Sequence, residues 1–396
     1  MKIISKFKQD YSKWLLVLIA SVSTIGFLLE SHKLSKIRSQ NRAYKKWFSK
    51  IPSSLPPSNP SARWPIQLQN IPFSDDLGIV LNSKTIAIRG VTAPYNASII
   101  ENEKSGSGYL LFFRYDEIDN DSSTLFHSHI ACAELDSNFE QTEKEFQHVT
   151  SIAEHAEDPR VLKVGSDLLL VYNALHCDPT HYRRTMRIAK IDPETFKASY
   201  DTNLDLQEQP VEKNWVPFVY AKKGKEPSVH FEYTISPRRI LDLPDPKTNS
   251  LVSLKFPQNS PFKRLFWPDD WGSLKGGTPA IKVDGEYLAF FHSSFNDNGY
   301  RWYMMGAYTF AGEPPFSITS ISQYPILFKG IYSSTPLNLI NLKLRCIFPC
   351  GFVVSNKDGR ELIHIACGEN DSAVRIVTLD KISLLKGLKK LKTKRV

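Results

Sequence analysis

Apolar strand-like runs recur along the chain, and five of them open at a proline. These prolines are spaced by 65, 58, 62 and 70 residues and are Pro94, Pro159, Pro217, Pro279 and Pro349. A quasi-regular period of this kind indicates a repeat architecture. Four strands with their turns take about 40–50 residues, so a period near 60 suits one propeller blade with a long loop. The pattern therefore predicts an all-β domain that forms a five-bladed β-propeller.

Within these repeats, turn residues separate pairs of apolar runs. Asp284-Gly285 and Asp358-Gly359 each stand between two such runs, and an Asp-Gly pair in that position is a strong signal for a β-hairpin. Further strands are expected at residues 186–192, 303–310 and 374–380. Almost no segment between Ser83 and Asp380 has the 3.6-residue period of a helix. The main domain is therefore predicted to consist of strands.

The N-terminal region departs from this pattern. Trp14–Leu29 is an uncharged apolar run of 16 residues, which is shorter than the roughly 20 residues that a spanning helix needs. No small-residue cleavage site follows it. We therefore expect an uncleaved signal anchor that crosses the membrane once as a helix and holds the propeller outside the cytoplasm. Basic residues on both sides of the run leave its orientation open.

The chain is expected to have four parts. They are a basic N-terminus with the anchor at about 14–30 (residues 1–46), a Pro/Ser-rich linker (47–62), the catalytic propeller (63–384) and a basic tail (385–396). Of the net charge of +9, residues 1–50 carry +9 and residues 386–395 carry +6, which leaves −6 on residues 51–385. A mildly acidic domain disfavours nucleic acid as a partner. The basic ends are typical of membrane flanks and solvated tails.

The cysteines point to packing rather than to chemistry. There are five, without the CxxC or Cys/His spacing of a zinc site, and no metal is expected. Each lies in or beside an apolar strand, where a small buried hydrophobe is the default. The alternative, in an exported domain, is a disulfide between Cys346 and either Cys350 or Cys367.

Polar residues stand where the inner strands are expected to begin, at the central channel of a propeller. They are Asn96, Glu157, Asp158, Lys213, Asn214 and Thr278, together with Asp371 at the end of a later strand. Carboxylate, amide and ammonium groups around one pocket suit a sugar ring, which needs many hydrogen bonds to its hydroxyls. The neighbouring aromatic residues are interpreted either as sugar-stacking platforms or as blade core: Tyr95, Trp215, Trp267, Trp271 and Phe291.

An ordered series of motifs resembles glycoside hydrolase family 130. The motifs are PYNAS (94–98), FFR (112–114), EDPRV (157–161), EKNW (212–215), GGTP (276–279), FFH (290–292), FPCG (348–351) and GENDSAVRIVTLD (368–380). The resemblance covers roughly residues 85–382 and implies a five-bladed propeller that acts on β-mannosides. It implies that Asp158 is the single catalytic acid and that Asn96 and Asp371 hold the glycosyl unit. It also places His292 on a histidine of the family. A related group of β-1,2-mannosyltransferases and phosphorylases shares the fold.

The residues leave the nucleophile open. Phosphate needs cations rather than a second carboxylate, and the candidates are Arg114, Arg160, Lys213, Arg238 and Arg239. Water needs a base about 6.5–9.5 Å from Asp158, and the candidates are Glu157, Glu212 and Glu232. Glu157 is the weakest of these, because neighbours along a strand point to opposite faces.

Each candidate also has a structural interpretation. Asp158 would cap a turn, Arg160 would pair with Asp158 or Glu157, Lys213 would be solvated, His292 would be a core histidine, and Asp371 would close a turn.

We predict an enzyme that catalyses inverting glycosyl transfer on β-linked mannosides, by phosphorolysis or synthesis, with Asp158 as general acid. The expected substrate-binding residues are Asn96, Arg114, Arg160, Lys213, Asn214, Thr278, His292 and Asp371. The partners are an oligosaccharide or glycan substrate and the membrane; no cofactor is expected, and inorganic phosphate or mannose 1-phosphate is the co-substrate. The alternatives are a membrane-anchored β-mannosyltransferase that uses a nucleotide sugar, a hydrolase, and a non-catalytic glycan-binding propeller.

Overall fold

The computed structural model describes residues 64–391 apart from 105, 107, 119–125, 178–181, 205, 223, 248–250, 255–266 and 336–342. Apart from the end of the strand at 109–118 and the start of the strand at 126–135, the sheets belong to a compact unit formed by residues 53–116 and 128–396. The predicted anchor and linker lie outside the described residues. Within the described part, no helix has the length and apolar character needed to cross a membrane.

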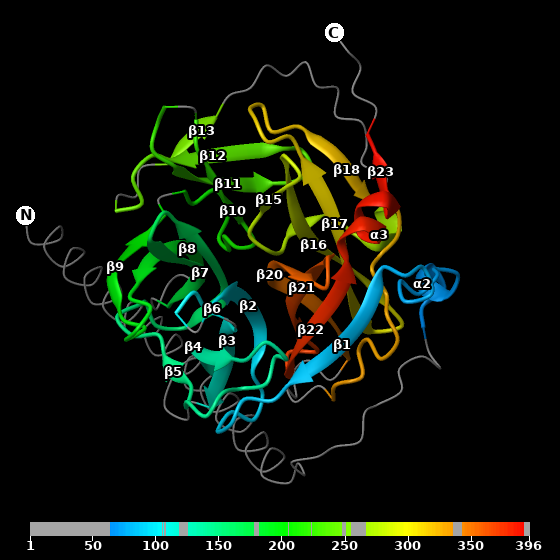
Figure 1. The fold of residues 1–396 in the computed structure, drawn as a ribbon, viewed down its shortest axis with the longest axis horizontal. Coiled ribbons are helices and arrows are strands. Elements are labelled where there is room, and N and C mark those ends of the chain that lie inside the picture. The colour runs from blue at the N-terminus through cyan, green and yellow to red at the C-terminus, as the bar shows by residue number, and fades with distance from the viewer. Residues whose placement is uncertain are drawn as a thin grey trace, which may run out of the picture. The chain divides into compact units, whose positions relative to one another are not determined.

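The described strands form five sheets (Figure 1). The first contains β2 (Tyr95–Glu101), β3 (Tyr109–Ile118), β4 (Phe126–Leu135) and β5 (Gln147–His148). The second contains β6 (Ala156–Val164), β7 (Asp167–Cys177), β8 (Tyr182–Ile191) and β9 (Ala198–Asn203). The third contains β10 (Val216–Tyr220), β11 (Ser228–Thr234), β12 (Arg239–Leu243) and β13 (Val252–Leu254). In each of these sheets the strands are neighbours in chain order.

The fourth and fifth sheets also recruit strands that are distant in sequence. The fourth contains β14 (Lys275–Gly276), β15 (Ile281–Val283), β16 (Glu286–Asp297), β17 (Tyr300–Phe310), β18 (Ile318–Ser322), β19 (Leu344–Arg345) and β23 (Leu388–Lys390). The fifth contains β20 (Ile347–Lys357), β21 (Arg360–Glu369), β22 (Ala373–Asp380) and β1 (Val80–Ile86). Short helices accompany them: α2 (Ile66–Gln69), η2 (Asp269–Trp271) and α3 (Lys381–Gly387).

The inner strands follow one another around the unit, which makes the fold propeller-like. Strand β2 lies against β6 and β20, β6 lies against β10, β11 against β14, and β16 against β20. The ring is closed by the pairing of β1 with β22, and Figure 1 shows the blue β1 beside the red β22. The first strand thus completes the last sheet, so that an edge strand is covered by a segment from the other end of the domain.

Four of the five sheets are regular four-stranded blades, so the prediction of five such blades is wrong in its count. The sheet expected around Pro279 has seven strands instead. Its inner strand is divided into β14 and β15, because Gly277-Thr278-Pro279 interrupts the pairing with β16. A Cβ at Gly277 would lie 2.5 Å from the carbonyl oxygen of Phe290, and proline has no N–H to donate to the ladder. Strands β19 and β23 extend the sheet, and β23 comes from the predicted basic tail.

The local turn signals are confirmed. Asp284-Gly285 joins β15 to β16 and Asp358-Gly359 joins β20 to β21, with positive φ at all four residues. Such two-residue turns match the twist of the strands they join. The predicted strands at 303–310 and 374–380 fall within β17 and β22, and the one at 186–192 overlaps β8.

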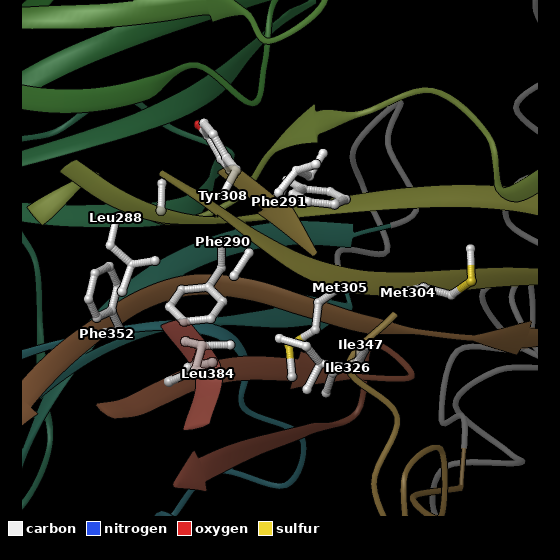
Figure 2. Close-up of a cluster of buried hydrophobic side chains, with 14 of the residues drawn as sticks. Leu288, Phe290, Phe291, Met304, Met305, Tyr308, Ile326, Ile347, Phe352 and Leu384 are labelled. Atoms are coloured by element: carbon white, nitrogen blue, oxygen red, sulfur yellow. The ribbon is translucent and has the colours of Figure 1, made fainter. Parts of the chain in front are cut away.

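Apolar residues of neighbouring blades form the cores between them. Figure 2 shows part of the largest cluster, where Phe290 and Phe291 of β16 lie among residues of β17, β20 and α3. Cys132, Cys346, Cys350 and Cys367 are free and buried, so no disulfide joins Cys346 to Cys350 or Cys367. The aromatic residues that were candidate sugar platforms are all at most 8% exposed, as the blade-core interpretation requires: Tyr95, Trp215, Trp267, Trp271 and Phe291.

Gly368 of β21 sets the distance between the first and fifth sheets. A Cβ there would lie 1.9 Å from Asn96 Oδ1 and 2.6 Å from the Asn96 nitrogen. We expect Gly368→Ala to lower the free energy of unfolding by about 3 kcal/mol, at the upper end of overpacking costs. Denaturant unfolding measures this. Gly359→Ala, with φ 77° and open space around it, is the control, because only the left-handed backbone opposes it, at about 1 kcal/mol. Equal costs for the two variants would show that the contact with Asn96 is not tight.

Candidate active site

Two inner strands carry bulges that bring a polar side chain of each together. The pairing register shifts within residues 95–98 of β2 and within residues 157–160 of β6. Asn96 (φ 46°) and Asp158 (φ 55°) have left-handed backbone in these bulges, which Asn and Asp adopt more readily than most residues. Bulges often re-aim side chains beside active sites. Here Asn96 Nδ2 donates a hydrogen bond to Asp158 Oδ1 over 2.8 Å, and both residues are 5% exposed.

The guanidinium of Arg114, on β3, contacts three carboxylates in this corner. Its Nη2 lies 2.9 Å from Glu157 Oε1, and its Nη1 lies 3.7 Å from Asp158 Oδ1. Its Nε donates to Asp116 Oδ1 over 3.0 Å. The ring of Tyr95 lies 4.8 Å from the guanidinium, and the Tyr95 hydroxyl donates to Asp116. Arg114 is therefore charge-compensated, and it organises the acids of the site.

Glu157 lies on the same side as Asp158, which corrects the expectation that the two point to opposite faces. The bulge interrupts the alternation of the strand, so Arg114 reaches both carboxylates. Arg184 of β8 also donates to Glu157. Burial raises the pKa of Glu157 and outweighs the opposing effect of Arg114 and Arg184. A carboxylate held between two arginines is a poor candidate for the base of a hydrolase.

Asp158 has a pKa below its ordinary value although the residue is buried. Burial raises this pKa, but Arg114, Arg160 and Lys213 lower it, and the hydrogen bond from Asn96 adds to their effect. In the absence of a ligand the carboxyl group is therefore ionised at neutral pH. A general acid must carry a proton, so the site needs additional negative charge before Asp158 is able to donate one.

Arg160 is fully buried and bonds mainly to backbone carbonyls. Its Nε donates to Gly277 over 2.5 Å, its Nη1 to the Asp158 carbonyl over 3.1 Å, and its Nη2 to Asn214 Oδ1 over 3.3 Å. Asn214 has φ 66° and lies two residues before β10. Arg160 thus links three blades, which extends the structural interpretation given above, while its charge still acts on Asp158.

Lys213 is the exposed cation of this group. It lowers the pKa of both Asp158 and His292, which places its ammonium near these two side chains. In the part of the chain that the structure describes, no carboxylate forms an ion pair with it. Lys213 is therefore available to an anionic ligand.

His292, on β16, is 2% exposed and packs 4.3 Å, centroid to centroid, from the ring of Phe348. Its Nδ1 has no hydrogen-bond partner among the described residues. Burial, followed by Arg160 and Lys213, lowers the pKa of His292 to about 3. The imidazole is therefore neutral at physiological pH and does not compete with the cations for an anion.

The remaining two predicted binding residues differ in their accessibility. Thr278 is fully buried, and its hydroxyl oxygen accepts a hydrogen bond from the backbone N–H of Phe290, so it is engaged within its own blade. Asp371 is half-buried in the turn between β21 and β22, with φ 50°. After burial, its charge is among the causes that raise the pKa of Tyr95 and of Tyr303, so Asp371 lies near the same site.

The other sequence candidates are engaged in structural contacts. Arg238 donates to Glu232, whose other oxygen accepts from Tyr308. Arg239 donates to both oxygens of Glu208 over 2.6 and 2.7 Å. The carboxylate of Glu212 accepts from the backbone of residues 208 and 209 and from the indole of Trp215. These contacts disfavour Arg238 and Arg239 as phosphate-binding cations. They also disfavour Glu212 and Glu232 as the base of a hydrolase.

Sequence reasoning missed two members of the network. Asp116 is two residues after Arg114 on the same strand, so the alternation of β3 was a usable signal that the two share a face. Arg184 gave no such signal, because it lies on a different strand from Glu157 and the two are far apart in the sequence.

Comparison with known proteins identifies the family. The family model of glycoside hydrolase family 130, described as beta-1,4-mannooligosaccharide phosphorylase, matches residues 76–390. The chain belongs to glycoside hydrolase family 130. The resemblance seen in the motifs, and the prediction of a carbohydrate-active enzyme, are thereby confirmed.

Solved structures and one curated protein are similar to this chain. A beta-1,2-mannobiose phosphorylase from Listeria innocua has a TM-score of 0.52 at 14% identity, covering 80% of this chain and 98% of its own. A mannose phosphorylase from Leishmania mexicana, MPT-4, solved in complex with phosphate ion, has a TM-score of 0.52 at 15% identity, covering 80% and 93%. At these identities the likeness concerns the fold.

Beta-mannosyltransferase 3 of Komagataella phaffii is 38% identical over 137 residues. The match covers 32% of this chain and 20% of that protein, so the chain spans about a fifth of the length of this curated relative.

Buried neutral His292 makes stability depend on pH. Its folded-state pKa of about 3 lies below the value near 6.5 of an unfolded histidine, so its contribution is complete above pH 6.5 and is lost as the pH falls toward 3. Between pH 7 and pH 5 we expect His292 to account for a loss of about 2 kcal/mol in the free energy of unfolding. His292→Gln should remove this part of the pH dependence, as measured by denaturant unfolding at the two pH values. His176→Gln, at an exposed histidine, is the control, and an unchanged pH dependence in His292→Gln would contradict the assignment.

Proposed function

We propose that this protein catalyses inverting mannosyl transfer between a β-mannoside and a phosphate-bearing partner, with Asp158 as the general acid. The observation that carries the proposal is the position of Asp158. It is a buried carboxyl group on a left-handed bulge, held by Asn96 and surrounded by three cations. Of the neighbouring carboxylates, Glu157 is bound by two arginines, which favours an anionic nucleophile over water.

In phosphorolysis, an oxygen of hydrogen phosphate attacks the anomeric carbon on the face opposite the leaving group. The glycosidic C–O bond breaks as the proton of Asp158 passes to the leaving oxygen. The products are mannose 1-phosphate, the shortened mannoside and an ionised Asp158. Synthesis is the same sequence in reverse, with mannose 1-phosphate as the donor and the acceptor hydroxyl returning its proton to Asp158.

The cations around Asp158 support an anionic co-substrate. Lys213 is without a carboxylate partner among the described residues. The positive charges of Arg114 and Arg160 also act on Asp158. An entering phosphate dianion offsets this positive charge and favours protonation of Asp158. Asp158 would then carry its proton when the phosphate nucleophile is bound.

A nucleotide-sugar mannosyltransferase is the second candidate. The match to a beta-mannosyltransferase favours it, and so does the predicted anchor and linker ahead of the domain, which is a usual layout for such enzymes. The single-pass anchor at about 14–30, and a propeller outside the cytoplasm, remain predictions. Incubation of the full-length chain with GDP-mannose or with mannose 1-phosphate, each with β-mannobiose as acceptor, separates the two candidates by the donor that is consumed.

Asp158→Asn tests the acid. We expect turnover of the active donor to fall by at least about 10²-fold, the scale of general acid catalysis, with donor binding retained. Steady-state assays of the full-length chain measure this. Asp167→Asn, at the partly exposed first residue of β7, which is paired with Lys190, is the control. If Asp158→Asn turns over at the wild-type rate, the assignment of the acid is wrong.

The pH profile tests the coupling between anion and acid. In the free enzyme the pKa of Asp158 lies below its ordinary value. The protonated acid is therefore lost as the pH rises through the acidic range, and kcat/KM should decline with it. With the phosphate co-substrate bound, the pKa rises, so the decline of kcat should lie at higher pH. The two profiles are measured for phosphorolysis at saturating and subsaturating phosphate. If kcat and kcat/KM decline over the same pH range, bound phosphate does not change the pKa of Asp158.

A further inference from the structure

The hairpin of β16 and β17 extends beyond the inner strand of its blade at the end that holds the site. Strand β14 pairs with β16 only as far as His292, whereas β16 and β17 continue to pair as far as Asp297 and Tyr300. The charges of Arg160, Lys213 and Asp158 change the pKa of His292, so the four side chains are near one another. The extension therefore projects from the neighbourhood of Asp158.

One face of this extension carries a row of side chains that leads away from the site. Ser294 is opposite Tyr303, and Asn296 is opposite Arg301, so all four share the face of His292. The rings of His292 and Tyr303 are 5.8 Å apart, and the guanidinium of Arg301 lies 4.9 Å from the centre of the Tyr303 ring. We call His292, Tyr303 and Arg301 the β17 row.

The charge of Arg301 is uncompensated among the described residues. Five other arginines also lie over aromatic rings, and four of them have a carboxylate partner: Arg114, Arg238, Arg239 and Arg375. Arg301 has no such partner in the described part of the chain, and its stacking on Tyr303 leaves the N–H groups at the edge of the guanidinium free to bind.

Strand β19 brings two more cations to the same hairpin tip. The N–H of Arg301 donates to the carbonyl of Lys343, and Arg345 is opposite Trp302. Arg345 and Lys343 lie 5.0 and 6.0 Å from the centre of the Tyr300 ring. Like Arg301, neither has a carboxylate partner among the residues described. By the alternation of the strands, Tyr300, Trp302 and Arg345 lie on the face of the hairpin opposite to Arg301, so these two cations do not extend the β17 row.

We propose that Arg301, at the outer end of the β17 row, forms a second anion subsite that binds a phosphate group remote from the reacting carbon. The guanidinium of Arg301 is separated from His292 by the Tyr303 ring, at successive spacings of 5.8 and 4.9 Å. A phosphate bound there is therefore too far out to be the nucleophile beside Asp158. The shared chemistry is a phosphate ester at a distance from the anomeric carbon, from either a nucleoside diphosphate donor or a phosphorylated glycan acceptor. This inference rests on the proposed function for the place of Asp158.

Direct binding to the full-length chain tests the subsite separately from turnover. GDP-mannose and β-mannobiose 6-phosphate are the probes with a remote phosphate, and mannose 1-phosphate is the probe whose only phosphate is on the reacting carbon. We expect Arg301→Gln to weaken at least one remote-phosphate probe by about 10-fold or more, as for loss of a charge-assisted bidentate contact. Mannose 1-phosphate should be unaffected. Arg301→Lys should be intermediate because it retains the charge without the planar fork, and Lys357→Gln, at the last residue of β20 and in a different sheet, is the control.

The outcomes divide cleanly. Loss of affinity for GDP-mannose alone assigns the subsite to a donor, and loss for the phosphorylated mannobiose alone assigns it to an acceptor. Unchanged affinities in Arg301→Gln, or an equal loss for mannose 1-phosphate, would overturn the subsite. Failure of the proposed function has a different signature, which is full turnover in Asp158→Asn whatever the behaviour of Arg301.

Discussion

The ion pairs of Arg114 are the interaction on which the chemistry of the site depends. Three carboxylates lie around one guanidinium in a region that excludes most solvent. Without that cation, buried carboxyl groups would take up protons rather than remain charged. Arg114 is closer to Asp116 and Glu157 than to Asp158, at 3.0 and 2.9 Å against 3.7 Å. Asp116 and Glu157 are thereby fixed as partners of the arginine, and Asp158 has a weaker contact with it.

The close approach of the inner strands makes these contacts between blades possible. A Cβ at Gly276 would lie 2.1 Å from the Asn214 carbonyl oxygen, and one at Gly351 would lie 2.3 Å from Ser98 Oγ. Only glycine fits such positions, because its neighbours are backbone or short side chains rather than flexible ones. The hydrogen bonds from Asn96 to Asp158 and from Arg160 to Asn214 both cross between blades within this packing. The site is therefore a product of the blade interfaces and not of one sheet.

In the part of the chain that the structure describes, cations without carboxylate partners lie at two places, one beside Asp158 and one further out on the β16–β17 hairpin. Lys213 beside Asp158, and Arg301 at the end of the β17 row, stand without carboxylate partners among the described residues, while Arg114, Arg238, Arg239 and Arg375 are paired. Two positive regions separated by His292 and Tyr303 suit a substrate with negative charge at more than one place.

The sequence alone determined the strands, the Asp-Gly turns, the prolines near the start of successive inner strands and the motifs of the family. These features depend on local periodicity, turn chemistry and a motif, and each is contained in a short segment. Tertiary structure decided which residues share the site. The bulge placed Glu157 beside Asp158, Arg238 and Arg239 found carboxylate partners, and β1 and β23 joined sheets built from other parts of the chain. Such contacts join residues that are far apart in sequence or turned by a local irregularity, and a pattern of polar and apolar positions records burial but not the partner of each side chain.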